Sequence, residues 1–163
     1  MDIDRAAALE RFVAAAGVFC GLVDDHTQHP DPAAWLRQIG DTLLRLDNDI
    51  KPLNGRAAEA EYSMLQNLEE RFLLFGRLKS YLGPLDEYWS EADLDASDGL
   101  KTGSLADDIT DLYFDLKRGL AVYRSGKSAE HQAVDLWLYS YKLHWQQHLR
   151  DAKKQLFDFQ RIG

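Results

Sequence analysis

Apolar residues recur at intervals of three and four positions along almost the whole chain, and this spacing restricts the chain to helical folds. Leu9, Phe12, Val13 and Ala16 begin one such series. Because an α-helix completes a turn about every 3.6 residues, each series forms an apolar stripe that must be buried against another helix. The sequence therefore predicts an all-α antiparallel helical bundle, a single domain of residues 1–163, with about five long helices over residues 3–24, 32–50, 57–82, 104–124 and 128–158.

Local residue chemistry indicates where these helices begin and how they approach one another. Asp31 offers a side-chain cap to the second helix, and Pro32 suits its first turn. Ser104 offers a similar cap to the fourth helix.

The third helix is apolar on several faces in its second half, which predicts a central position. Five glycines fall inside helices and predict close helix approach, namely Gly17, Gly21, Gly40, Gly76 and Gly119.

The longest connection, residues 84–103, is acidic and contains Tyr88 and Trp89. Connections longer than about 15 residues without structure of their own are uncommon in compact domains. We therefore expect a short helix near residues 85–91, and we expect Trp89 to hold the segment against the core.

The chain carries a formal net charge of −8, which makes attraction to nucleic-acid phosphates or anionic lipid headgroups unfavourable. Its densest basic stretch is interrupted by Asp151 and Asp158 and is typical of a solvated helix end. This stretch consists of Arg150, Lys153, Lys154 and Arg161. We expect neither nucleic acid nor membrane as a partner, which leaves a protein partner or self-association into a homo-oligomer.

Cys20 is the single cysteine of the chain, so neither an intrachain disulfide nor a thiolate zinc site is expected. It lies on the apolar stripe of the first helix, where a thiol packs as a small hydrophobe. Residues 1–11 are acidic where a secretory signal would be basic, and no unbroken apolar run approaches the roughly 18 residues of a membrane span. These features predict a cytoplasmic protein.

An acidic band runs beside the apolar stripe of the fourth helix. It comprises Asp107, Asp108, Asp111 and Asp115, which lie on one side of the helix because of their spacing. Asp108 and Asp115 are nearest the stripe. The band could therefore face a neighbouring helix.

The fifth helix carries a pair of histidines, His144 and His148, one turn apart on the same face. This spacing can chelate a single metal ion. Trp137 and Tyr141 lie close by on that side. The remaining histidines, His26, His29 and His131, are expected to be solvated.

The turn near Gly126 makes the fourth and fifth helices a hairpin, and Asp108 and His144 lie equally far from it. We expect Asp108 and Asp111 to face His144 and His148 in a mixed carboxylate and imidazole pocket. One interpretation is a divalent metal site for zinc, manganese or magnesium, with these four residues as ligands or as acid and base.

A structural interpretation accounts for the same residues and is the simpler one. Acidic side chains in the first turn of a helix are favoured by the helix dipole by about 0.3–1 kcal/mol, whatever the function. An aspartate beside a histidine in a bundle is commonly a buried hydrogen bond that orients the ring.

The stretch GSLADDITDLYFDLKRGLAVY from Gly103 to Tyr123, followed by Trp137, Tyr141 and HWQQH from His144 to His148, resembles the DUF5063 family, a bacterial domain of unknown function. The resemblance is concentrated in residues 103–148. Gln146 and Gln147 stand where the family motif has a glycine and a basic residue. The resemblance implies an all-helical bacterial fold and implies no activity.

Two functions follow from these patterns. The first is a non-catalytic binding or interaction module that uses the acidic connection 84–103 with Tyr88 and Trp89, or self-association. The alternative is a metal-dependent, hydrolase-like enzyme with its site between the fourth and fifth helices. An open pocket at the aspartates and histidines would favour the enzyme, and an exposed apolar patch would favour the interaction module.

Overall fold

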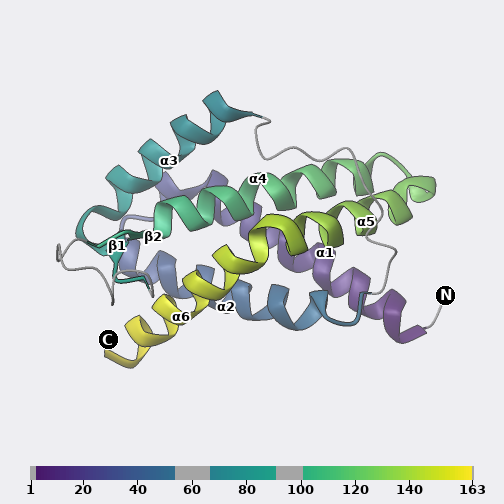
Figure 1. The fold of residues 1–163 in the computed structure, drawn as a ribbon, viewed down its shortest axis with the longest axis horizontal. Coiled ribbons are helices and arrows are strands. Elements are labelled where there is room, and N and C mark those ends of the chain that lie inside the picture. The colour runs from purple at the N-terminus through teal and green to yellow at the C-terminus, as the bar shows by residue number, and fades with distance from the viewer. Residues whose placement is uncertain (1–2, 54–66, 91–100, 163) are drawn as a thin grey trace.

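The computed structural model describes residues 3–53, 67–90 and 101–162. Among these residues the fold is a helical bundle with one small antiparallel sheet, as Figure 1 shows. The helices are α1 (Ile3–Asp24), α2 (Pro32–Ile50), α3 (Leu68–Leu82), α4 (Leu105–Arg124), α5 (Glu130–Ser140) and α6 (Gln146–Ile162). A π-helical turn (Tyr141–Trp145) joins α5 to α6 in one continuous rod, so the predicted all-α fold is confirmed.

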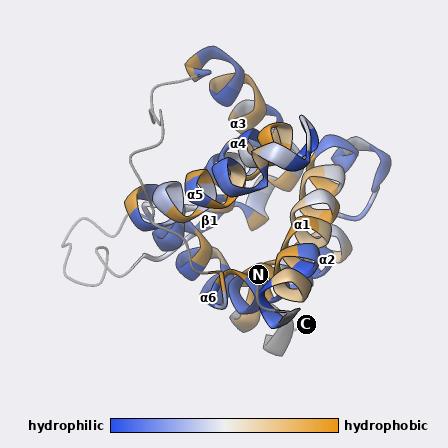
Figure 2. Ribbon diagram, turned by 90° about the vertical axis from the view of Figure 1, so that its right-hand side faces the viewer, coloured by the Kyte–Doolittle hydropathy of each residue, from blue (hydrophilic) through white to orange (hydrophobic). Residues whose placement is uncertain are grey.

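The helices pack around α4. It contacts α1, α3, α5 and α6, while α2 packs against α1 and α6. In Figure 2 hydrophilic and hydrophobic residues are both present along α3 and α4, as expected of amphipathic helices, whereas α1 is mostly hydrophobic. The prediction that the third helix is central is wrong, because α3 lies on the outside of α4 and its Phe72 is 73% exposed. The predicted first part of that helix, residues 57–66, lies outside the described residues.

The side-chain caps predicted from sequence are present. Asp31 accepts a hydrogen bond from the Ala33 amide (3.0 Å) at the start of α2, and Pro32 is its first residue. Ser104 accepts one from the Asp107 amide (3.2 Å) at the start of α4. These local bonds satisfy amides that the first turn of a helix leaves without partners.

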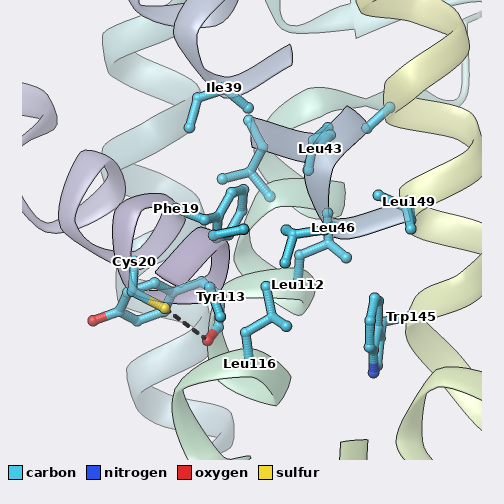
Figure 3. Close-up of a cluster of buried hydrophobic side chains, with 14 of the residues drawn as sticks. Phe19, Cys20, Ile39, Leu43, Leu46, Leu112, Tyr113, Leu116, Trp145 and Leu149 are labelled. Atoms are coloured by element: carbon cyan, nitrogen blue, oxygen red, sulfur yellow. Dashed lines mark hydrogen bonds between the residues drawn. The ribbon is translucent and has the colours of Figure 1, made fainter. Parts of the chain in front are cut away.

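The hydrophobic core lies between α1, α2, α4 and the rod of α5 and α6. Figure 3 shows Phe19, Leu43, Leu112 and Trp145 converging from four elements. Cys20 is buried among them, and burial raises the pKa of its thiol to about 12. The prediction that Cys20 packs as a buried hydrophobe is confirmed.

Helix α1 is long and apolar enough to cross a membrane when judged by length and composition alone. Core helices pass the same test. Here Phe12, Phe19 and Val23 of α1 are fully buried within the bundle.

The predicted short helix near residues 85–91 is wrong. A 3-10 turn (Gly83–Leu85) leads into strand β1 (Glu87–Tyr88), which pairs antiparallel with β2 (Gly103–Ser104). Tyr88, and not Trp89, is buried, because its ring packs directly on Gly103, where any Cβ would clash. Trp89 is 50% exposed.

Asp86 anchors this segment to the start of α4. Its side chain is buried and accepts hydrogen bonds from the Ser104 hydroxyl (3.0 Å) and the Ala106 amide (2.7 Å). Its backbone carbonyl accepts from the Leu105 amide (2.9 Å). The connection between α3 and α4 is therefore held at the same end of α4 as its acidic residues.

Candidate metal centre between α4 and the α5–α6 rod

Three aspartates of α4 point toward the rod formed by the π-turn and α6. The side chains of Asp108 and Asp115 are almost fully buried, and that of Asp111 is 19% exposed. Asp107, on the neighbouring side of the helix, is exposed. The spacing of three and four residues places these three carboxylates along one face of α4.

Two histidines approach these aspartates from the opposite helix. His144 lies in the π-turn and His148 in α6. The Nδ1 atom of His144 lies 2.7 Å from Asp115 Oδ2, and the Nδ1 atom of His148 lies 2.7 Å from Asp108 Oδ1. Each ring is therefore oriented by its own buried carboxylate.

The other nitrogen of each ring faces the third aspartate. His148 Nε2 lies 3.0 Å from Asp111 Oδ2, and His144 Nε2 lies 3.6 Å from the same oxygen. The two ring centroids are 4.9 Å apart and the rings are inclined by 78°. Three potential ligand atoms from Asp111, His144 and His148 thus converge, all within 4.8 Å of one another.

Two further residues complete the network. The sequence did not indicate Arg71, and it indicated Tyr88 only as part of the acidic connection 84–103. Arg71 of α3 donates to Asp111 Oδ1 (2.7 Å) and to Asp115 Oδ1 (3.1 Å). The Tyr88 hydroxyl of β1 donates to Asp108 Oδ2 (2.5 Å). No motif marks either residue, because each is brought to α4 by tertiary packing. The burial of Arg71 on a largely exposed helix is visible only in the structure.

Mutual interactions fix the charges of these groups. Burial opposes ionisation of Asp111, but hydrogen bonds from His144 and His148 outweigh it and hold its pKa well below the usual range. Hydrogen bonds to Asp111 and Asp115 raise the pKa of His144 to about 9. Burial opposes protonation of His148, but Asp108 and Asp111 raise its pKa to about 10. Burial raises the pKa of Asp108 despite its hydrogen bond from His148.

The charges of the network balance. Asp108, Asp111 and Asp115 face Arg71 and, in the metal-free protein at neutral pH, two imidazolium rings. A divalent cation bound to neutral rings would bring the same two positive charges as the two ring protons. One divalent ion can therefore replace two protons here without leaving a buried charge unbalanced.

The structure brings together most, but not all, of the residues singled out in the sequence. Asp108, Asp111, Asp115, His144 and His148 meet as one cluster. Trp137 and Tyr141 do not join it. Trp137 is buried against Phe12 and donates to the Leu116 carbonyl, and Tyr141 lines a cleft between α2 and α6.

The predicted pairing of Asp108 with His144 is wrong by one turn, since Asp108 pairs with His148. The connection between α4 and α5 is not centred on Gly126, because it also contains a 3-10 turn (Lys127–Ala129). Residues at equal distances from Gly126 are therefore not opposite each other. The π-turn (Tyr141–Trp145) lies between this connection and His148 and further changes which residues are opposite each other.

The expectation that His26 is solvated is also wrong, as its ring is buried and contacts the Val23 carbonyl at 2.7 Å.

An open pocket of about 640 Å³ lies beside this cluster. Asp111 and Thr110 of α4 form one wall, and Phe72 and Phe75 of α3 form another. The Thr110 hydroxyl is buried and has no hydrogen-bond partner among the described residues. Asp111 therefore lies between the histidines on one side and a largely apolar pocket on the other.

Comparisons with known proteins agree with this fold. A family model described as a domain of unknown function (DUF5063) matches residues 4–160, well beyond the two helices that carried the resemblance. The crystal structure of protein BF1032 from Bacteroides fragilis superposes with a TM-score of 0.71 at 20% identity, covering 93% of this chain and 90% of that one. At this identity the likeness shows the fold alone. Among curated proteins, none matches this chain.

Proposed function

This chain belongs to the DUF5063 family, and we propose that it binds one divalent transition-metal ion through Asp111, His144 and His148. The observation that carries the proposal is the convergence of both Nε2 atoms on Asp111 Oδ2, at 3.0 and 3.6 Å. Two ligands about 2.1 Å from one ion, at tetrahedral or octahedral angles, lie about 3.0–3.4 Å apart. The two distances from Asp111 Oδ2 to the Nε2 atoms are therefore close to those of ligands that share one ion.

The surroundings of the histidines support metal ligation. A metal-bound histidine usually donates its other ring N–H to a carboxylate, which fixes the tautomer and directs the lone pair at the ion. Asp115 serves His144 in this way, and Asp108 serves His148. Asp111 adds a third carboxylate, whose Oδ2 lies beside both Nε2 atoms and can serve as the remaining protein ligand.

The donor set also selects a class of metal. Two imidazole nitrogens and one carboxylate oxygen suit zinc, iron, cobalt or nickel better than magnesium, which prefers oxygen ligands. Among the ions considered from sequence, zinc fits best and magnesium fits least. The partial exposure of His144 (14%) and His148 (21%) leaves a path for an ion from solvent.

The test is isothermal titration of untagged, chelator-treated protein with zinc, after elemental analysis of the protein as purified. We expect one ion per chain, and we expect Asp111→Asn to weaken binding at least 100-fold because it removes a charged ligand without changing its shape. Asp107→Asn is the matched control, since it makes the same change at an exposed neighbour in the same helix.

Two results would count against the assignment. Absence of stoichiometric binding by the wild-type protein would leave the cluster as a structural hydrogen-bond network. Loss of binding in Asp107→Asn with retention in Asp111→Asn would move the ion to the neighbouring group of Asp107, Asp108 and His148, whose ligand atoms also lie close together. Circular dichroism of each variant separates loss of a ligand from loss of the fold.

The pocket beside Asp111 favours a second candidate, metal-dependent hydrolysis. Three protein ligands leave a coordination position for water, and a zinc-bound water ionises near neutral pH. The pocket could hold an apolar substrate group against Phe72 and Phe75, with Thr110 as a hydrogen-bonding group. Zinc-dependent turnover of small esters that falls in Thr110→Val, while zinc affinity is unchanged, would distinguish an enzyme from a metal-binding module.

The interaction module predicted from residues 84–103 stays a prediction. Residues 91–100 of that segment lie outside the described residues, and Tyr88 is engaged with Asp108. The described apolar residues that are well exposed include Leu68 and Phe72 of α3 and Trp89. Light scattering of the wild type and Phe72→Ser at high concentration would test self-association through α3, and a wild-type monomer would contradict it.

A further inference from the structure

A second cleft lies on the opposite side of α6 from the metal centre, between the end of α2 and α6. We call it the α2–α6 cleft. Its volume is about 510 Å³, within the range of about 300–1,000 Å³ typical of small-molecule pockets. It is lined by Leu44, Asp47 and Lys51 at the end of α2, by Tyr141 of the π-turn, and by Gln146, Leu149, Arg150, Lys153, Lys154 and Phe157 of α6.

The cleft is strongly basic in a chain whose formal net charge is −8. Lys51, Arg150, Lys153 and Lys154 line it, and among the described lining residues Asp47 is the one acidic side chain. Lys153 contacts Asp47 at 2.6 Å and Lys51 contacts the same oxygen at 3.5 Å. Asp47 thus positions two of the cations and leaves the lining with an excess of positive charge.

Tertiary structure creates this concentration of charge. The basic stretch of α6 was expected to solvate a helix end, and Lys51 lies about a hundred residues away in sequence. Packing of α2 on α6 brings Lys51 to Lys153 through their shared partner Asp47. Arg150 is exposed and forms no ion pair with any described residue.

Apolar side chains form the remaining walls. Leu149 is buried at the base, while Leu44 and Phe157 are 47% and 61% exposed. The aromatic ring of Tyr141 adds a further partly buried surface. The cleft therefore combines a group of cations with an apolar base and two exposed apolar walls, which is the composition that suits a ligand with one charged end and one apolar end.

We propose that the α2–α6 cleft binds a small amphiphilic anion, a carboxylate or phosphate group attached to a medium-length hydrocarbon or aromatic tail. The anion pairs with Arg150, Lys153 and Lys154, and the tail packs on Leu44, Leu149 and Phe157. Arginine suits either anion because its planar guanidinium donates two parallel hydrogen bonds. The cleft is separate from the metal centre, so the two proposals can fail independently.

The test is calorimetric titration of the full chain with decanoate, decyl phosphate and decanol, each below its aggregation concentration. We expect saturable binding of the anions at one site per chain, and binding of decanol at least tenfold weaker. Arg150→Glu should weaken decanoate binding at least tenfold because it replaces attraction by repulsion at the anion. Lys127→Glu, the same charge change in the α4–α5 connection, should leave it within twofold.

Further variants distinguish anion binding in this cleft from anion binding elsewhere on the protein. Phe157→Ser should weaken binding of both anions, whereas Phe72→Ser on the exposed face of α3 should not. Asp111→Asn should bind decanoate as the wild type does. The stronger of decanoate and decyl phosphate identifies the preferred anion, and equal affinities still support the proposal.

The proposal is overturned by several outcomes of the same experiments. These are no saturable binding of either anion, equal affinity for decanol and decanoate, or equal weakening by Arg150→Glu and Lys127→Glu. A separate titration with vesicles that contain an anionic lipid completes the test. Binding to the vesicles without binding to the free anions would also overturn the proposal, because it would indicate a membrane surface in place of a small ligand.

Discussion

Asp111 connects three helices through the two oxygens of one carboxylate. Its Oδ1 accepts from Arg71 of α3, and its Oδ2 faces His144 and His148 on the α5–α6 rod. The arginine contact fixes the carboxylate so that the second oxygen is presented to the rings. At the scale of single residues, the site therefore depends on groups that hold ligands in place as much as on the ligands.

Removal of the Tyr88 hydroxyl tests this dependence. Tyr88→Phe leaves a buried oxygen of Asp108 without its donor, and this should destabilise the protein by about 1–3 kcal/mol. Because Asp108 orients His148, we expect zinc affinity to fall about tenfold. Urea unfolding and zinc titration measure the two effects. Tyr123→Phe is the control, and equal zinc affinity in both variants would show that Asp108 needs no support.

The raised histidine pKa values predict how stability depends on pH in the metal-free protein. The pKa values of about 9 for His144 and about 10 for His148 lie above the value of about 6.5 expected in the unfolded chain. The folded protein therefore binds more protons than the unfolded chain between these values. The stabilisation is fully present below about pH 6.5 and is lost as pH rises through 9 to 10.

This loss should amount to a few kcal/mol and can be followed by urea unfolding with a chelator present at pH 6, 7.5 and 9. A double variant, His144→Gln with His148→Gln, should show a much flatter dependence over this range. If the wild type were equally stable at pH 6 and pH 9, the rings would not be charged in the folded protein.

At the scale of elements, the close approach of α4 and α5 positions the two faces of the metal centre. Gly119 of α4 lies directly under the Trp137 indole, where a Cβ would clash, and the indole donates to the Leu116 carbonyl at 3.2 Å. This contact confirms the predicted close approach at Gly119. Gly21 and Gly76 show no such neighbour.

These glycines give a matched pair of substitutions. Gly119→Ala should destabilise the protein by about 1–3 kcal/mol or more, because the indole must move within a packed core. Gly76→Ala adds a methyl group in open space on a helix and should stabilise by up to about 1 kcal/mol. Thermal and urea unfolding compare them, and equal effects would contradict the packing contact.

The π-turn is the second element that matters for the site. It carries His144 and ends at Trp145, whose ring is fully buried and donates to the Ser140 hydroxyl at 3.0 Å. Single π-turns within α-helices occur frequently at functional sites. Here the turn allows the rod to place Trp145 in the core while His144 faces α4.

At the scale of the whole molecule, the proposed ion would link α4 to α6. Ligands that bind only the folded state stabilise it, by about 2.7 kcal/mol at a concentration 100 times the Kd. For a chain of this size, that corresponds to a rise in Tm of roughly 5–10 °C. We expect this rise for the wild type with zinc and a rise of at most about 2 °C for Asp111→Asn, whose binding should be at least 100-fold weaker. An equal rise in both proteins would indicate binding elsewhere.

The sequence predicted the helices well because their signals are local. The bounds of α1 and α2 match the predicted ranges, and α4 begins one residue after the predicted start, since periodic apolar residues and caps such as Asp31 and Ser104 act within a few positions of each other. The bands of aspartates on α4 and histidines on the rod were predicted for the same reason, because helical spacing alone places them on common faces.

Only the tertiary structure decided which residues of these bands meet and what supports them. Each of these contacts joins positions that are distant in sequence. Asp108 pairs with His148, Arg71 and Tyr88 bind the aspartates of α4, and Lys153 and Lys51 share Asp47. Such contacts depend on how closely helices approach and on turns within them. The spacing of apolar residues along a helix predicts which face of that helix is buried. The distance between two packed helices, and which residues lie opposite each other, depend on the side chains of both helices and of their neighbours.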